Sequence, residues 1–268
     1  MALAQTRGVG QPAITHAMRI TMSEPNFGRL RLYNAGMGVL HAVQGAAVLL
    51  LSNDFALPVS AAFMEGPPGT PASTEELFTL PLGPAVAAFL FLSAIAHFVV
   101  AGPGWGKYQR DLAAHRNEQR WIEYAFSSSL MIVLIAMITG IADVAALVAL
   151  FGVNAAMILF GWLQERYEEP GSGRWWPFVF GCIAGIVPWI AIGIYLIGPT
   201  AEIPGFVYGI FVSLFVFFNS FAINQLLQYR QTGPWRDYEF GEAVYVGLSL
   251  VAKSALAWQV FANTLVPS

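Results

Sequence analysis

Seven long apolar segments, separated by shorter polar ones, form the main pattern of the chain. Each has about twenty residues or more, which is enough to cross ~30 Å of hydrocarbon as a helix. They cover residues near 31–52, 79–102, 119–140, 142–165, 175–198, 204–229 and 240–263. Gly102-Pro103-Gly104 and Gly233-Pro234 mark two of the joints. Because backbone polar groups in lipid must be satisfied within each span, the pattern predicts an all-α membrane protein, a bundle of seven transmembrane helices.

The connection between the first two segments, residues 53–78, is long and contains no lysine or arginine. Connections of this length usually have structure or function of their own. Residues 56–64 alternate weakly between apolar and polar side chains. This alternation favours a short β-hairpin on the outer face, and an irregular loop is the alternative.

The lysine and arginine residues are distributed asymmetrically along the chain. Twelve of the 13 fall on one side of the predicted bundle, in the N-terminal tail and in every second connection. They are Arg7, Arg19, Arg29, Arg31, Lys107, Arg110, Arg116, Arg120, Arg166, Arg174, Arg230 and Arg236. The positive-inside rule then places the N-terminus in the cytoplasm and the C-terminus outside, which requires an odd number of spans.

Composition supports the same class of protein. Apolar residues make up 56% of the 268 and charged residues 11%, which excludes an ordinary soluble domain. A net charge of −3 gives no indication of a nucleic-acid partner. With Cys182 as the single cysteine, neither an intrachain disulfide nor a cysteine metal site is possible.

The chain divides into a short tail and one domain. We expect a cytoplasmic tail over residues 1–28 and a seven-helix domain over 29–265. The first 25 residues contain no apolar core of signal-peptide length, so we expect no cleaved export signal.

The thirteenth cation, Lys253, lies about twelve residues into the last apolar segment. A fixed ammonium at that depth costs at least roughly 2.5–3.5 kcal/mol on insertion scales. Such a lysine needs a partner, a lowered pKa or a covalent modification. Lysine in an apolar pocket is the usual amine for a Schiff base with a carbonyl compound, so we expect Lys253 to carry an aldehyde cofactor.

Glu123 is the first candidate partner for this lysine. It shares a helical face with Arg120 and Ser127. One interpretation is a local Arg120–Glu123 ion pair at the membrane boundary, which contributes little. The other is that Glu123 is the counterion of a protonated Schiff base on Lys253, because an opposite charge within ~4–6 Å favours the charged form.

The sequence places Lys253 and Glu123 at different depths in the membrane. Lys253 is about twelve residues from the cytoplasmic end of its segment, whereas Glu123 is only a few residues into its own. The two depths match if the helix of Glu123 begins well before Arg120, near residue 110, with Arg120 partly buried. A lysine side chain that reaches toward the cytoplasmic end also reduces the difference.

Polar pairs at helical spacing occur in the first two segments, His41 with Gln44 and Ser93 with His97. Histidines in membrane spans usually face the bundle interior. They form either a satisfied structural network or a cluster that takes up a proton during function, consistent with an imidazole pKa near ~6.5. Two histidines fall short of the roughly four ligands of a closed metal site, so no metal is expected.

Ser249 precedes Lys253 by one helical turn and lies on the same face. It either hydrogen-bonds a Schiff base or bonds back to its own helix. Aromatic residues such as Trp189 and the stripe Phe211, Phe215 and Phe218 serve either as packing or as walls for a flat polyene.

The sequence around these residues resembles the heliorhodopsins, retinal-binding seven-helix proteins distantly related to microbial rhodopsins. The similarity covers nearly the whole chain after residue 30. Its most specific pieces are residues 53–58, 66–70, 120–129, 141–143, 151–155, 181–189, 204–209 and 249–258. The family's inverted topology, with a cytoplasmic N-terminus, agrees with the distribution of cations.

The resemblance implies a role for each matching residue. Lys253 would bind retinal (all-trans in the dark), Glu123 would be the counterion, and Ser249 would replace the second carboxylate of the pumps. Ser127 is also expected among the residues that bind the chromophore. The other side chains implied near the chromophore are Tyr124, Asn154, Met157, Ile158, Gly161, Trp189, Phe218 and Gln225.

The resemblance also implies a polar cavity on the cytoplasmic side. It would contain His41 and His97, and we add Ser93, Gln44 and Arg120 to it as proton-accepting surroundings. In the family, the 53–78 loop forms a small β-sheet and the protein is a homodimer.

Net proton transport is not expected. Pump rhodopsins carry acids at the counterion position and eleven residues later, where this chain has Glu123 and Leu134. The predicted function is a light sensor in the cell membrane with a slow photocycle, no ion pumping and an unknown cytoplasmic signalling partner, rather than an enzyme. A light-gated or light-driven proton or ion transporter, and a retinal-free protein with a structural lysine, are the alternatives.

Overall fold

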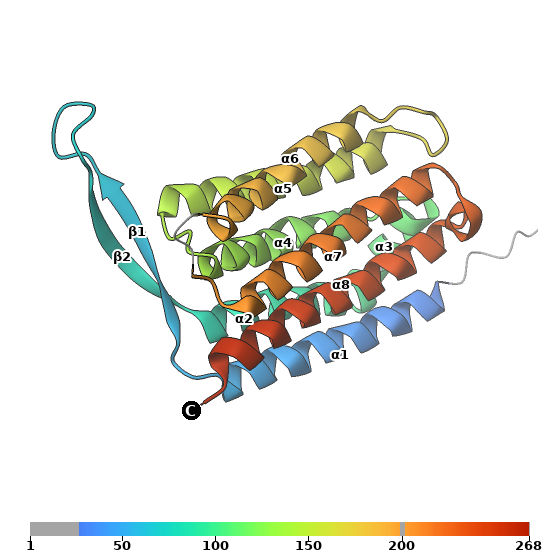
Figure 1. Cartoon of the computed structure of the whole chain (residues 1–268). Helices are drawn as coiled ribbons and strands as arrows, with labels where there is room; N and C mark the ends of the chain where they lie inside the picture. The colour runs from blue at the N-terminus through green and yellow to red at the C-terminus, as the bar shows by residue number, and fades with distance from the viewer. Residues whose placement is uncertain (1–26, 199–201, 268) are drawn as a thin grey trace, which may run out of the picture.

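The seven apolar segments form seven long helices in the computed structural model, which describes residues 27–198 and 202–267 (Figure 1). Most of the predicted tail, residues 1–28, lies outside the described residues. The helices that are long and apolar enough to span a membrane are α1 (Gly28–Leu51), α2 (Leu82–Ala101), α4 (Glu118–Ile138), α5 (Val144–Tyr167), α6 (Trp176–Leu196), α7 (Gly205–Tyr229) and α8 (Tyr238–Val260). The predicted all-α membrane fold is therefore confirmed, and the chain is a multi-pass membrane protein.

The shorter elements connect these helices. They are strands β1 (Ala56–Phe63) and β2 (Ser73–Pro81), helix α3 (Trp105–Ala113), the 3-10 turn η1 (Gly233–Arg236) and the π turn η2 (Phe261–Leu265). The sequence analysis missed α3, which is too short to span a membrane. Helix α3 packs its buried Tyr108 and Leu112 against the bundle with Phe27, Leu30 and Val100.

Side-chain caps explain where several helices begin. The side chain of Asn117 accepts a hydrogen bond from the backbone N–H of Arg120, and Asp143 accepts one from Ala146. Asp237 caps α8 by accepting a hydrogen bond from the backbone N–H of Glu239. These caps satisfy donors that the first turn of a helix leaves free. The helix of Glu123 begins at Glu118, as the predicted segment 119–140 indicated, and α3 is a separate helix before it. An earlier start near residue 110, one condition for matching the depths of Glu123 and Lys253, is therefore not met.

Helix α4 lies inside the bundle and contacts α2, α5, α6 and α7. Its residues Ile132, Leu134 and Ile135 have no exposed surface and belong to the main apolar core. Helices α1 and α2 pack on each other, as do α5 and α6. A polar residue on the inner face of α4 is therefore surrounded by other helices.

The connection between α1 and α2 is an antiparallel hairpin, so the prediction of a hairpin was correct and its irregular alternative was wrong. Its register pairs Ala56 with Pro81 and Phe63 with Ser73. Near its base, the N–H of Ser60 donates to the carbonyl of Ala142 at 2.9 Å, which ties the hairpin to the link between α4 and α5. The hairpin projects beyond the bundle at the end where the C-terminus lies (Figure 1).

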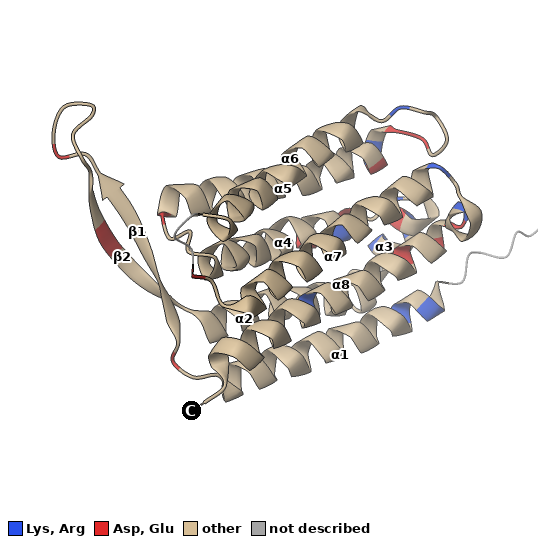
Figure 2. Ribbon diagram, viewed as in Figure 1, with Lys and Arg blue, Asp and Glu red and all other residues tan. Residues whose placement is uncertain are grey.

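Lysine and arginine residues gather at the opposite end of the bundle (Figure 2). We call this the cation-rich end, and the other the hairpin end. The cation-rich end comprises α3, the α5–α6 and α7–α8 connections and the adjacent helix termini. The seven-helix topology thus brings the cations of alternate connections together, as the sequence analysis expected.

Candidate functional site

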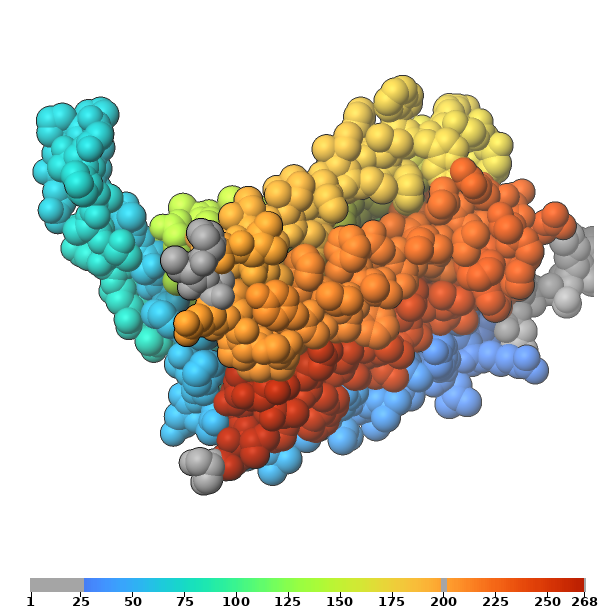
Figure 3. Space-filling model, viewed as in Figure 1, coloured from blue at the N-terminus to red at the C-terminus, as the bar shows by residue number. Residues whose placement is uncertain are grey.

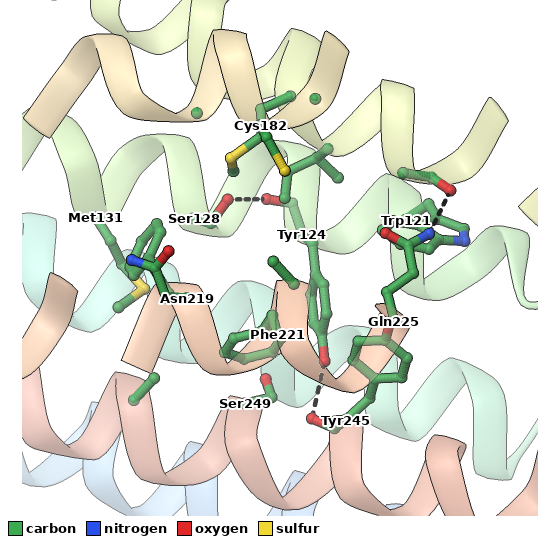
Figure 4. A pocket seen from close by; sticks show the side chains of 18 of the residues that line it. Trp121, Tyr124, Ser128, Met131, Cys182, Asn219, Phe221, Gln225, Tyr245 and Ser249 are labelled. Carbon is green, nitrogen blue, oxygen red and sulfur yellow. Dashed lines mark hydrogen bonds between the residues drawn. The ribbon is translucent and has the colours of Figure 1, made fainter. Parts of the chain in front are cut away.

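A cavity of about 170 Å³ lies between α4, α5, α6, α7 and α8. Apolar and aromatic side chains form most of its wall, including Trp189, Phe218 and Tyr124. Figure 4 shows its labelled residues, with Cys182 contributed by α6 and Asn219 and Phe221 by α7. The surface is hollowed between α6 and α7 (Figure 3). Cys182, which lines the cavity, is exposed. A long apolar ligand would be enclosed by these five helices and would meet the membrane face at one side.

Lys253 lines this cavity and is 3% exposed. Its Nζ donates to Glu123 Oε1 at 2.9 Å and to Ser249 Oγ at 2.8 Å. Ser93 Oγ donates to the same Glu123 oxygen at 2.6 Å. Glu123 therefore pairs with Lys253 and not with Arg120, and the alternative of a local Arg120–Glu123 ion pair is excluded.

The two helices meet in a register that explains how residues of different depth come together. Asn117, the cap of α4, donates to Glu242 of α8 at 2.6 Å, so these positions are level. Glu123 is six residues further along α4 and is level with the region just before Ser249. At 1.5 Å per residue, Lys253 then lies about 7 Å beyond it, a distance that a lysine side chain spans by reaching back along its helix.

The predicted polar pairs are arranged differently from their spacing in the sequence. The His41 and His97 rings stack at 5.5 Å between centroids, and His97 Nδ1 lies 2.8 Å from Asn34 Oδ1. Both ring nitrogens of His41 are buried without a hydrogen-bond partner among the described residues. Gln44, in contrast, accepts a hydrogen bond from Trp258 Nε1 at 2.8 Å and is not part of this group.

Most residues implied near the chromophore do line the cavity. They are Tyr124, Ser127, Met157, Ile158, Gly161, Trp189, Phe218, Gln225, Ser249 and Lys253. Asn154 lies one layer behind, where its amide donates to Ser128 and Ser129 at 2.9 and 3.0 Å. Glu123 contacts the cavity through Lys253.

Phe215, part of the predicted aromatic stripe, also lines the cavity, and other wall residues were not predicted from the sequence. They include Trp121, Ser128, Met131, Phe178, Cys182, Asn219, Phe221 and Tyr245. Trp189 packs its indole edge-on against the rings of Phe211, Phe215 and Phe218. The phenylalanine stripe was visible in the sequence, but only the packing of α6 on α7 decides which of its rings reach the cavity.

Arg120 lies away from the histidine pair, in a separate polar cluster near the cation-rich end. Its Nη2 is 2.7 Å from Glu165 Oε1 and 3.1 Å from Glu242 Oε1. All three side chains are at least nine-tenths buried. The grouping of Arg120 with His41 and His97 in one cavity was therefore incorrect. Neither Glu165 nor Glu242 was singled out as a site residue in the sequence.

The sequence profile of the heliorhodopsin family matches residues 30–265 of this chain. The chain belongs to the heliorhodopsin family. A search of curated proteins finds no match. Among solved structures, the bundle is similar to the crystal structure of the light-driven proton pump Coccomyxa subellipsoidea rhodopsin CsR, with a TM-score of 0.55 and 17% identity.

That similarity covers 88% of this chain and 95% of the pump. At this identity it establishes a shared fold, which is the seven-helix rhodopsin fold, and carries no conclusion about pumping. Membership of the heliorhodopsin family implies a retinal chromophore. The cavity fits such a group, because a buried amine on α8 projects into an apolar chamber with aromatic walls.

Proposed function

We propose that this heliorhodopsin is a light sensor in which retinal is bound as a protonated Schiff base to Lys253, with Glu123 as the counterion. The observation that carries the proposal is the 2.9 Å contact between Lys253 Nζ and Glu123 Oε1 at the wall of the cavity. The Lys253 nitrogen in this contact stands for the Schiff-base nitrogen.

When bound, retinal would supply absorption of visible light and a change of shape on illumination. The residues around Lys253 would then hold the proton of its nitrogen. Glu123 accepts hydrogen bonds from Lys253 and Ser93, and Ser249 lies 2.8 Å from the same nitrogen. Trp189 and Phe218 would flank the polyene. His41 is buried, and its ring nitrogens have no hydrogen-bond partner among the described residues, so we assign to it the role of taking up a proton on the Glu123 side.

The packing beyond Lys253 supports a protein without net pumping. Toward the hairpin end, the side chains of Ile132, Ile135, Leu256 and Val260 have no exposed surface, and the polar Gln259 on that side is already bonded to Ser213. These apolar side chains offer no partner for a proton in transit. The hydrogen-bond partners of Lys253, Glu123 and Ser249, lie on its other side, so a proton that leaves the Schiff base would stay on the side of the cation-rich end.

We further propose that the cation-rich end faces the cytoplasm, in accordance with the positive-inside rule. The N-terminal tail and an unknown signalling partner would then be on that side. The hairpin tip, with Phe63 and Met64 exposed, supports its use as a contact between two copies in a homodimer.

The proposal is tested by two substitutions. The chain has two lysines, Lys253 in the bundle and Lys107 in α3. In cells supplied with retinal, we expect Lys253→Ala to abolish the visible band of the purified protein and Lys107→Ala to leave it unchanged. A visible band that survives in Lys253→Ala would rule out the assignment.

A second measurement separates sensing from transport. On illumination of cells or vesicles that contain the wild-type protein, we expect no net change of external pH. A light-driven pH change that an uncoupler abolishes would favour the alternative function, a light-driven transporter.

A further inference from the structure

Two carboxylates and a single guanidinium are buried together near the cation-rich end. Arg120 of α4 contacts Glu165 of α5 and Glu242 of α8, and the three side chains are 5% exposed or less. If both carboxylates were ionised, the cluster would hold one uncompensated negative charge. Burying an unpaired charge is strongly unfavourable, and a buried group of this kind takes up a proton instead.

Glu165 receives more hydrogen bonds than Glu242. Arg120 Nη2 and the Tyr238 hydroxyl donate to its Oε1 at 2.7 and 3.0 Å. The backbone N–H of Asn117 and the indole N–H of Trp121 donate to its Oε2 at 2.9 and 2.6 Å. Hydrogen bonds of this kind favour the ionised carboxylate. Glu242 has one such bond, from Asn117 Nδ2 to its Oε2, and its Oε1 has no hydrogen-bond partner among the described residues.

Arg120 provides a second sign that this cluster binds something besides its own side chains. Its guanidinium is sandwiched between the rings of Trp121 and Tyr245, at 4.1 and 3.8 Å from their centroids. Its Nε and Nη1 are buried and lack a hydrogen-bond partner among the described residues. Buried polar atoms without protein partners are usually satisfied by water.

Titratable and charged groups surround the two carboxylates on several elements. They are Tyr108 on α3, His115 after α3, Arg120 and Tyr124 on α4, Tyr229 on α7, Arg236 in η1, and Tyr238 and Tyr245 on α8. Of these, only Arg120 is a buried cation, since His115 and Arg236 are exposed. Burial also raises the pKa of Tyr108, so that its hydroxyl stays neutral. The neighbours therefore do not supply the missing positive charge.

A small pocket of about 40 Å³ connects this cluster with the solution. Its lining includes Glu165 at the inside and the exposed side chains of His115, Gln231 and Arg236 at the rim. The volume admits water. Tyr238 lies between Glu165 and the rim of the pocket. Its hydroxyl donates to Glu165, and its ring stacks on that of His115 with 5.1 Å between the ring centroids.

We propose that Glu165 and Glu242 together bind one proton and exchange it with the solution at the cation-rich end past Tyr238 and His115. This proton-binding site is separate from the Lys253–Glu123 pair. It does not depend on retinal chemistry, and its test needs no illumination.

The test is infrared spectroscopy of the coloured wild-type protein in the dark, with the carbonyl stretch of a protonated carboxylic acid as the signal. We expect the band at neutral pH and its loss as the pH is raised. Both Glu242→Gln and Glu165→Gln should lack it, because either change leaves one carboxylate balanced by Arg120. Glu123→Gln should retain it, which separates this site from the counterion.

The visible band reports whether each variant has folded. A wild-type protein without the titrating carbonyl band overturns the proposal, even where a variant fails to fold. Persistence of the band in either folded glutamine variant also overturns it, because a shared proton requires both carboxylates.

The proposed proton route past Tyr238 is tested separately. The measured quantity is the rate at which the carbonyl band shifts after transfer of the protein to deuterated water. Tyr238→Phe removes the hydroxyl that bonds Glu165 and should slow this exchange several-fold. Tyr167→Phe alters a tyrosine that is 71% exposed and serves as the control. Equal exchange rates in the wild-type protein and Tyr238→Phe would refute the route past Tyr238.

Discussion

At the residue scale, the ammonium of Lys253 is stable in the bundle because three groups face it. Glu123 supplies the opposite charge, Ser249 supplies a hydroxyl, and the ring face of Tyr124 lies with its centroid 5.1 Å from Nζ. A carboxylate at this distance lowers the free energy of the charged nitrogen relative to the neutral one. The same contacts would keep a Schiff base on Lys253 protonated in the dark.

Removal of the counterion should therefore have two measurable effects. In Glu123→Gln, the positive charge is no longer held at the nitrogen, so we expect the visible band to move to longer wavelength. The protonated form is also less stable, so the pH at which this band is lost should fall by ~1–3 units, the effect of an opposite charge at short range. Both are read from absorption spectra across a pH titration.

Glu118→Gln is the matched control for this change. Glu118 lies on the same helix but at its first residue, where it pairs with Lys107 and Arg166 near the surface. Its removal should leave both the wavelength and the titration unchanged. An unshifted spectrum in Glu123→Gln would mean that another group is the counterion.

The sequence was sufficient to propose Lys253 and Glu123, because one is a lone cation in a membrane segment and the other a rare acid on a polar face. It was insufficient for Glu165 and Glu242. Both lie close to the ends of apolar segments, where acidic residues are ordinarily solvated. Their burial results from α3 and the α7–α8 connection covering that end, which no helical periodicity indicates.

At the scale of single helices, α5 provides a backbone surface for the cavity. A Cβ atom at Gly161 would lie 2.6 Å from Trp121 Cζ3, and the carbonyl of Gly161 accepts a hydrogen bond from Gln225. Trp121 in turn donates to Glu165. The absence of a side chain at Gly161 therefore permits the close packing of α4 on α5 beside the cavity.

Two glycines of α5 should respond in opposite ways to alanine. Gly161→Ala forces Trp121 to move and should destabilise the coloured protein by roughly 1–3 kcal/mol, as overpacking does. Gly152→Ala is the control, since a Cβ there meets nothing within 4 Å. It should be neutral or stabilising by up to about 1 kcal/mol, because alanine favours helix over glycine.

The measurement is the temperature at which the visible band of each purified variant is lost. A Gly161→Ala protein as heat-resistant as the wild type would contradict the packing argument.

The elements themselves were predicted with uneven success. Apolar length located the seven spans, and weak alternation indicated the hairpin, because each is a local property of the chain. The beginning of α4 at Glu118 agrees with the predicted segment 119–140, whereas the cap that Asn117 forms and the separate helix α3 were not predicted. The meeting of Glu123 with Lys253 depends on the register of α4 against α8, which the bond between Asn117 and Glu242 reveals.

At the scale of the whole molecule, polar and apolar layers alternate along the bundle. The cation-rich end contains the Arg120 cluster, the middle contains Lys253 and its partners, and the interior at the hairpin end is mostly apolar. In the proposed function, this arrangement would allow protons to exchange on one side only, as expected of a sensor and not of a pump.

The orientation of this layered molecule can be tested by labelling. In a Cys182→Ser background, Thr70→Cys places a thiol in the hairpin loop and Ser172→Cys places one in the α5–α6 connection, both at exposed positions. On intact cells, a membrane-impermeant maleimide should label Thr70→Cys and not Ser172→Cys, because the cation-rich end is expected in the cytoplasm. Labelling of Ser172→Cys alone would reverse the orientation.

The attachment of retinal to Lys253 is tested most directly by reductive trapping. Protein produced with retinal is treated with borohydride under illumination, digested and mapped by mass spectrometry. We expect the retinyl group on the peptide that contains Lys253 and none on the peptide that contains Lys107. Colourless protein without an adduct, or an adduct on Lys107, would contradict the account.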